Sequence, residues 1–69
     1  MKVNYQWHSA PKELPDCWCV CVTHYNGGYH INVWNPYYKV WDNEDGDYSQ
    51  FEASEKLDWM VLEVKEESK

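Results

Sequence analysis

The chain has 69 residues and a formal net charge of −6, and all six of its basic residues are lysines. This length suits one domain, near the lower limit at which a hydrophobic core stabilises a fold unaided. Nucleic-acid binders need a basic face to displace counterions from phosphates, so we expect no direct binding to DNA or RNA. The chain shows neither a secretory leader pattern nor an apolar run of membrane-spanning length, so we expect a cytoplasmic protein without a membrane partner.

Aromatic residues provide the material for a core in so short a chain. Five Trp, six Tyr and one Phe make up 17% of the residues. Each buried aromatic side chain removes roughly 150–250 Å² from water. The domain can therefore fold without a metal or cofactor, and we expect neither. Three cysteines, an odd number, argue against a disulfide framework.

The first sixteen residues predict an irregular lead-in, because Pro11 and Pro15 interrupt regular structure. We expect Trp7 to anchor this lead-in to the body of the domain. The chain is expected to form a single small domain over 1–69. Its parts are the lead-in at 1–16, a sheet at 17–64 and a solvated tail at 65–69.

Residues 17–25 and 28–35 predict two strands joined by Asn26-Gly27. This pair favours a type I′ turn, in which both central residues need positive φ. A two-residue loop would place four apolar β-branched residues on one face: Val20, Val22, Ile31 and Val33. A three-residue loop would set Val22 opposite Asn32, so we prefer the first register.

The second half predicts two further strands. Asn35-Pro36 favours a turn, after which a third strand is expected from about residue 37 to 42. Residues 43–47 form a polar turn, and residues 48–56 form either a loop or one helical turn. Residues 57–64 predict the last strand. The expected fold is mainly β, a small antiparallel meander of about four strands.

Cys17, Cys19 and Cys21 alternate with apolar residues and are expected on one face of a strand. Neighbouring thiols on a straight strand are about 6.6 Å apart along the chain. That spacing does not suit chelation of one zinc ion by neighbouring cysteines. In the preferred register His30 shares the cysteine face, whereas His24 projects to the other. We expect the cysteines to act as small buried hydrophobic residues, with no metal site.

The acidic segment from Asp42 to Asp47 resembles part of a calcium-binding loop. If Gly46 takes the sixth loop position, Glu52 takes the twelfth, but the first falls on Trp41, which has no oxygen ligand. A charged hairpin turn is expected instead.

No set of residues predicts catalysis. Three His and three Cys match the composition of a cysteine hydrolase, but no local signature surrounds any cysteine. A domain of this size has little room for a pocket that excludes water, and its acids cluster in a turn and a tail. We expect no enzymatic activity.

A small sheet buries one face well, so some aromatic rings are expected to face solvent. Exposed Trp and Tyr are favoured anchors of protein interfaces. The residues expected to contact a partner are Trp34, Tyr37, Tyr38, Trp41, Asp42, Glu44, Asp45 and Asp47. The alternative is that most of the rings form the core.

Two stretches resemble a known family. Trp7 stands seven residues before Leu14-Pro15, the short apolar stretch 20–22 follows, and residues 57–62 are Leu-Asp-Trp-Met-Val-Leu. This pattern resembles the phage- and prophage-associated family catalogued as domain of unknown function 551, which closes on Thr-His-Trp-Met-Pro-Leu-Pro. The chain departs from it at both closing prolines and at Thr-His. The resemblance implies a phage or prophage origin and brings no catalytic residues.

These observations favour a non-enzymatic protein-interaction module, a phage- or prophage-encoded accessory protein with a protein partner. Residues 1–40 carry a net charge of +1 and residues 41–69 a net charge of −7. The partner surface is therefore expected to be basic if charge contributes to binding. The alternative is that the acidic half imitates nucleic acid and inhibits a host nucleic-acid-binding or defence enzyme.

Overall fold

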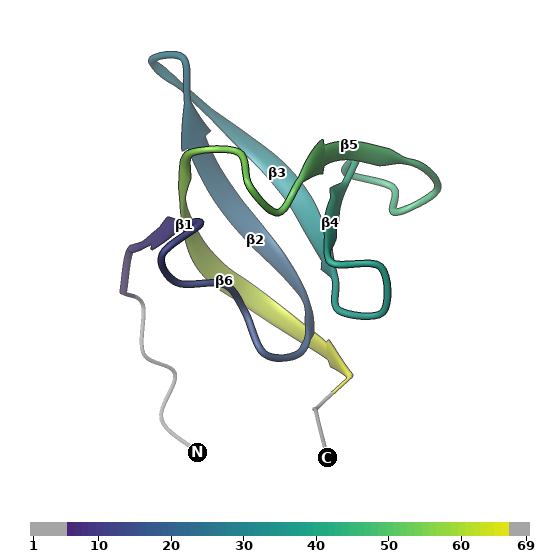
Figure 1. Cartoon of the computed structure of the whole chain (residues 1–69). Coiled ribbons are helices and arrows are strands. Elements are labelled where there is room, and N and C mark those ends of the chain that lie inside the picture. The colour runs from purple at the N-terminus through teal and green to yellow at the C-terminus, as the bar shows by residue number, and fades with distance from the viewer. Residues whose placement is uncertain (1–5, 67–69) are drawn as a thin grey trace.

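The computed structural model describes residues 6–66 and contains one antiparallel sheet of six strands (Figure 1). The strands are β1 (His8–Ala10), β2 (Trp18–Tyr25), β3 (Gly28–Asn35), β4 (Val40–Asp42), β5 (Ser49–Glu52) and β6 (Leu57–Glu66). Their order across the sheet is β1-β6-β2-β3-β4-β5. The expected mainly-β antiparallel fold is confirmed, with two short strands, β1 and β5, beyond the four that were predicted.

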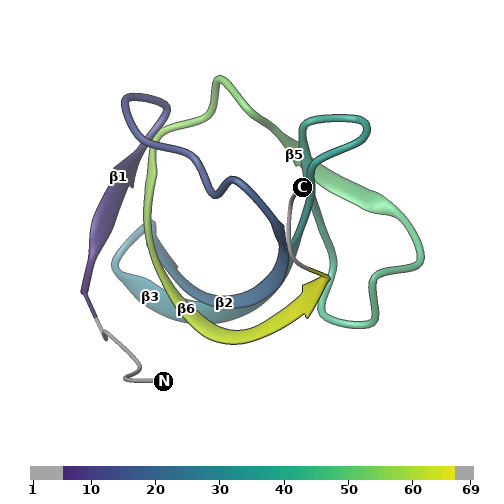
Figure 2. The same ribbon diagram turned by 90° about the horizontal axis from the view of Figure 1, so that it is seen from below.

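The sheet is strongly curved. In Figure 2, β2, β3 and β6 form a trough, and the lead-in and the β5–β6 connection lie across its open side. The pairing of β2 with β6 shifts register twice, so that Leu62 and Lys65 have no partner in β2. Such bulges bend the strand that carries them and increase its twist. Residues 6–66 include no helix long and apolar enough to cross a membrane.

The central hairpin has the predicted register. Asn26 and Gly27 have φ values of 52° and 76°, as a type I′ turn requires. Val22 lies opposite Ile31, and Val20 lies opposite Val33. The four β-branched residues therefore share one face, as expected.

The core lies on the other face, which is the concave side of the trough. Cys19, Cys21, Thr23 and Asn32 alternate with the valines and are fully buried there. The remaining core residues come from four strands, β1, β3, β4 and β6: Ala10, Trp34, Trp41, Leu57 and Trp59. On the convex face Val20, Val22 and Ile31 stay partly exposed.

Three tryptophans dominate the core. Trp34 and Trp41 are paired across β3 and β4 with ring centroids 4.9 Å apart, and Trp59 lies 6.2 Å from Trp41. The indole Nε1 atoms of Trp34 and Trp41 are buried without a hydrogen-bond partner. Each unsatisfied donor costs about 1–3 kcal/mol, whereas burying 150–250 Å² of ring gains about 4–6 kcal/mol. Burial of the ring therefore outweighs the loss of its hydrogen bond.

A buried amide connects β3 to the β4–β5 pair. Asn32 Oδ1 accepts a hydrogen bond from Thr23 Oγ1 at 2.5 Å. Asn32 Nδ2 donates to the Asp42 carbonyl oxygen at 3.0 Å and to Gln50 Oε1 at 2.9 Å. The amide thereby fixes the position of β4 and β5, and with them the acidic turn between these strands.

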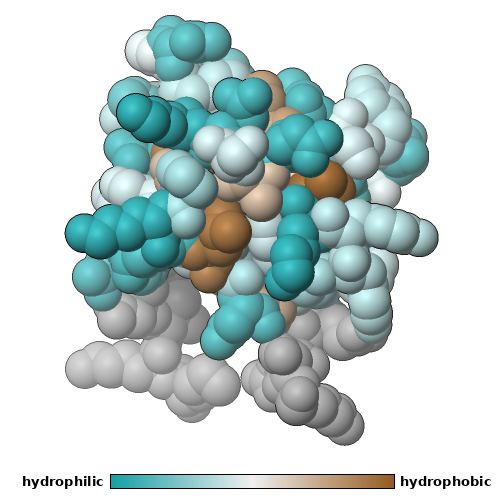
Figure 3. All heavy atoms as spheres, viewed as in Figure 1, coloured by the Kyte–Doolittle hydropathy of each residue, from teal (hydrophilic) through white to brown (hydrophobic). Residues whose placement is uncertain are grey.

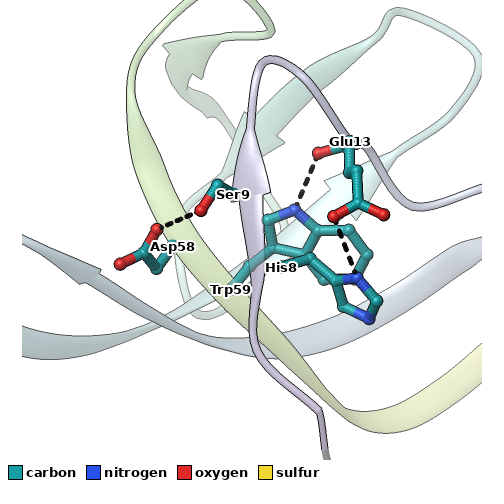
Figure 4. A network of polar contacts seen from close by, with 5 residues as sticks. All are labelled: His8, Ser9, Glu13, Asp58 and Trp59. Atoms are coloured by element: carbon teal, nitrogen blue, oxygen red, sulfur yellow. Dashed lines mark hydrogen bonds and ion pairs between the residues drawn. The ribbon is translucent and has the colours of Figure 1, made fainter.

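Trp59, more than Trp7, holds the lead-in against the sheet. Trp59 Nε1 donates to the Glu13 carbonyl oxygen at 2.9 Å, and the His8 ring stacks on the indole with centroids 4.4 Å apart (Figure 4). His8 Nδ1 lies 3.5 Å from Glu13 Oε1. Trp7 also contacts the sheet, with its ring centroid 6.1 Å from that of Tyr29, but it remains 42% exposed and is a less buried anchor than Trp59. The lead-in also contains β1. Residues 1–5 of the lead-in lie outside the described part of the chain.

Three further expectations are corrected. Tyr37 and Tyr38 belong to the β3–β4 turn, because the third strand of the predicted meander begins only at Val40. Residues 49–52 form β5, and no helical turn occurs between 48 and 56. β6 extends to Glu66, and the rest of the expected tail, 67–69, lies outside the described residues.

Candidate protein-binding surface

Three of the eight residues expected to contact a partner are buried. Trp34 and Trp41 point into the core, because their positions in β3 and β4 share the concave face with the cysteines. Asp42 is buried on the opposite face, and its Oδ2 atom accepts a hydrogen bond from Asn35 Nδ2 at 3.5 Å. The prediction is therefore wrong for these three side chains.

Tyr37 and Tyr38 are on the surface, as predicted. They are 68% and 79% exposed. Asn35 Oδ1 accepts hydrogen bonds from the backbone N–H groups of both residues, at 2.9 and 3.3 Å, and so shapes the turn. The Tyr37 ring meets Trp18 edge-on with centroids 5.9 Å apart. This contact joins the exposed turn to the convex face of β2.

The acidic turn is also exposed, and Asn43 organises it. Asn43 Oδ1 accepts hydrogen bonds from the backbone N–H groups of Asp47 and Tyr48 at 3.0 and 3.2 Å. The Gly46 N–H donates to the Asn43 carbonyl oxygen at 2.9 Å, and Gly46 takes a φ of 74°. The three exposed carboxylates of the turn belong to Glu44, Asp45 and Asp47.

The acidic turn lines a hollow on the convex face, and the Tyr37 ring contacts Trp18 in its wall. We call it the Trp18 hollow; it has a volume of ≈370 Å³ and is lined by Trp18, Val20, Val33, Glu44, Asp45, Gly46 and Lys65. The valines and the Trp18 ring give it apolar walls, while the turn and Lys65 give it a charged rim. The sequence prediction missed Trp18, although Trp18 shares the alternation of Val20 and Val22 in β2.

The cysteines lie closer together than a straight strand allows. Cys19 and Cys21 are fully buried, and their Sγ atoms are 3.6 Å apart. The thiols point to the concave side of a curved strand, where side chains converge, so the expected separation is wrong. Their hydrogen bond and their burial raise the pKa of the Cys19 thiol far above its usual range. A thiol that stays protonated is neither a nucleophile nor a metal ligand.

The described residues offer few arrangements for other chemistry. Residues 6–66 contain no group of three or more His, Cys, Asp and Glu side chains placed to hold a metal ion. Ser9, Asp58 and His24 lie in register on β1, β6 and β2, and Ser9 Oγ donates to Asp58 Oδ1 at 2.8 Å. In a hydrolytic triad the histidine lies between the nucleophile and the acid. Here the acid is central and accepts the Ser9 hydrogen bond directly, so the arrangement differs from that of the triad.

Comparison with known proteins gave no matching family model, no similar curated protein and no similar solved structure.

Proposed function

We propose that this chain is a non-enzymatic protein-interaction module that binds its partner through the Trp18 hollow and the adjoining Tyr37 and Tyr38. The observation that carries the proposal is the hollow itself, which combines apolar walls with an acidic rim. Its volume of ≈370 Å³ lies in the lower part of the range of about 300–1,000 Å³ that is usual for ligand pockets. It suits one or two side chains of a protein partner. A partner with basic residues around an apolar anchor fits this surface.

The origin of the protein is proposed from its sequence. The spacing of Trp7 and Leu14-Pro15, together with residues 57–62, resembles the phage-associated family named above. We infer an accessory protein of a phage or prophage that acts in the host cytoplasm. Its partner is then a host or phage protein.

The arrangement of the carboxylates favours this proposal over imitation of nucleic acid. A phosphate track requires charges spaced along a ridge. Glu44, Asp45 and Asp47 instead share one turn, Asp42 is buried, and Lys65 lies at the same hollow. An acidic rim around an apolar site gives specificity and a faster association rate rather than most of the affinity.

Affinity capture from host lysate, followed by measurement of the Kd with the purified partner, tests the proposal. Trp18→Ala is expected to weaken binding about 30-fold or more, as interface tryptophans commonly do. Tyr48→Ala, which removes an exposed aromatic side chain that does not line the hollow, serves as the matched control and is expected to leave the Kd unchanged. Equal binding of wild type and Trp18→Ala would refute the proposed surface.

The salt dependence of the same Kd discriminates the alternative. A nucleic-acid mimic depends on its charges, so its affinity falls steeply with salt and with the combined change Glu44→Gln, Asp45→Asn and Asp47→Asn. Under our proposal the charge-neutralised variant loses much less affinity than Trp18→Ala. The reverse ranking would establish mimicry and remove the interaction module as the explanation.

A further inference from the structure

A second hollow lies near the hairpin end of the convex face. It has a volume of ≈180 Å³ and is lined by Trp7, His24, Tyr29 and Asp58, and we call it the Trp7 hollow. The sheet register creates it, because His24 lies opposite Tyr29 on β3 and opposite Asp58 on β6. Trp7, the residue that precedes β1, completes the lining of the hollow. Four side chains from distant parts of the sequence therefore meet here.

Three of the four lining groups are aromatic rings at tilted angles. The Trp7 and Tyr29 centroids are 6.1 Å apart with their planes at 50°, and those of His24 and Tyr29 are 4.4 Å apart at 42°. Tyr29 is 70% exposed, so much of its ring is available to a ligand. The π face of an aromatic ring attracts a cation that lies within about 6 Å of its centroid.

The fourth lining group supplies a negative charge. Asp58 Oδ1 accepts the hydrogen bond from Ser9 Oγ at 2.8 Å, which orients the carboxylate. Figure 4 shows Ser9 and Asp58 on the opposite side of the β1–β6 pair from His8 and Trp59. Asp58 therefore faces the surface hollow and not the core. A carboxylate has more acceptor positions than this one hydrogen bond uses.

We propose that the Trp7 hollow binds the side-chain ammonium group of a lysine on a partner protein. Aromatic faces combined with a carboxylate provide the two attractions that an organic cation uses. The volume of ≈180 Å³ is too small for a drug-sized ligand, which needs about 300 Å³ or more, and suits the end of one side chain. This inference rests on the proposed function only in taking a protein as the partner.

Lysine fits this site better than arginine. A guanidinium group is most strongly recognised by two parallel hydrogen bonds to both oxygens of a carboxylate. Ser9 already occupies one acceptor position on Oδ1 of Asp58, which leaves fewer geometries for that pairing. An ammonium group acts as a point charge and needs only one such contact.

One positive charge opposes the ligand. Lys56 lines a neighbouring hollow that also includes His24 and Asp58. Its ammonium group repels an incoming cation, so its removal is expected to improve binding. This prediction separates an electrostatic site from a merely apolar one.

NMR titration with small probes tests the inference without the natural partner. The probes are Nα-acetyl-lysine methylamide, its Nε-trimethyl form, the arginine analogue and the neutral norleucine analogue. The two lysine probes are expected to shift the indole N–H signal of Trp7, assigned with the Trp7→Phe variant, with a Kd of roughly millimolar order. The arginine probe is expected to bind several-fold more weakly, and the norleucine probe to give no saturable shift.

Variants assign the effect to this hollow. Tyr29→Ala is expected to weaken lysine binding about two- to fivefold. Asp58→Asn keeps the acceptor for Ser9 and is expected to weaken binding by a similar factor, while Lys56→Gln strengthens it. Tyr38→Ala, in the other exposed aromatic surface, is expected to have no effect.

Two outcomes would overturn the inference. One is a norleucine probe that binds as tightly as lysine, and the other is a lysine affinity unchanged by Asp58→Asn. Neither result would contradict the proposed function, because that function is tested by the Kd of the full partner for wild type and Trp18→Ala. Conversely, failure of partner capture would not alter the result obtained with the small probes.

Discussion

The buried amide of Asn32 offers the sharpest test of how the surface is held in place. In Asn32→Ala the Thr23 hydroxyl and the Asp42 carbonyl both lose a hydrogen-bond partner while they remain inside the protein. Each stranded group costs about 1–3 kcal/mol, so the free energy of unfolding should fall by about 2–6 kcal/mol. Gln50 is exposed and regains water, so it adds little.

This loss is large for a chain of 69 residues. Domains have a stability of about 0.05–0.15 kcal/mol per residue, which gives about 3–10 kcal/mol here. Urea unfolding followed by tryptophan fluorescence measures the change through the midpoint and slope of the transition. If Asn32→Ala fails to fold, Thr23→Val gives the same information, with an expected loss of about 1–3 kcal/mol. Thr23→Ser keeps the hydroxyl and is the matched control.

A double-mutant cycle isolates the hydrogen bond between the two side chains. Once Asn32→Ala has removed the acceptor, Thr23→Val should leave the free energy of unfolding unchanged or raise it. The buried hydroxyl that lost its hydrogen-bond partner is then no longer present. The expected coupling energy is about 1 kcal/mol or more, within the usual range for contacting residues. A coupling below about 0.5 kcal/mol would show that the network does not hold β3 to β4 and β5 as described.

The acidic turn and the cysteines give three further predictions. Gly46→Ala should lower the free energy of unfolding by about 1–2 kcal/mol in the urea assay, because alanine is strained at φ 74°, whereas Gly46→Asn should lower it less. Asn43→Ala should cost about 1 kcal/mol in the same assay, and Asn43→Asp, which keeps an acceptor oxygen, should cost less. Iodoacetamide should label Cys17 in the native protein far faster than Cys19 or Cys21, even at pH 9, because burial and a raised pKa keep the Cys19 thiol protonated. Mass spectrometry would contradict this interpretation if it found Cys19 labelled at the rate of Cys17.

Local signals predicted the central hairpin and its register. Asn26-Gly27 favours one turn type, and that turn fixes every pairing between the two strands. The buried face was not predictable in the same way, because both faces of β2 are apolar. The face that carries Cys19 and Cys21 became the core because the sheet curves around it, and curvature depends on pairing between β2 and the distant β6.

The errors at the candidate surface share this cause. Trp34 and Trp41 were expected on the surface because nothing local distinguishes a core tryptophan from an exposed one. β5 was missed because residues 49–52 contain a single large apolar residue, Phe51, and pair only through the tertiary fold. Figure 3 shows the side seen in Figure 1, where apolar atoms appear among hydrophilic ones rather than as one broad patch. Hydropathy alone therefore does not identify a binding site on this side of the molecule.

The two hollows are related through a single strand. Trp18 and His24 both point to the convex face of β2, since they are six residues apart and alternate residues share a face. At about 3.3 Å per residue, the Cα atoms of Trp18 and His24 are at most about 20 Å apart. A partner that places an apolar anchor in one hollow and a lysine in the other must span a distance of this order. Sites that far apart contribute independently, so Trp18→Ala and Asp58→Asn should have additive effects on the free energy of binding. If the same partner group served both hollows, the combined variant would instead lose little more than Trp18→Ala alone.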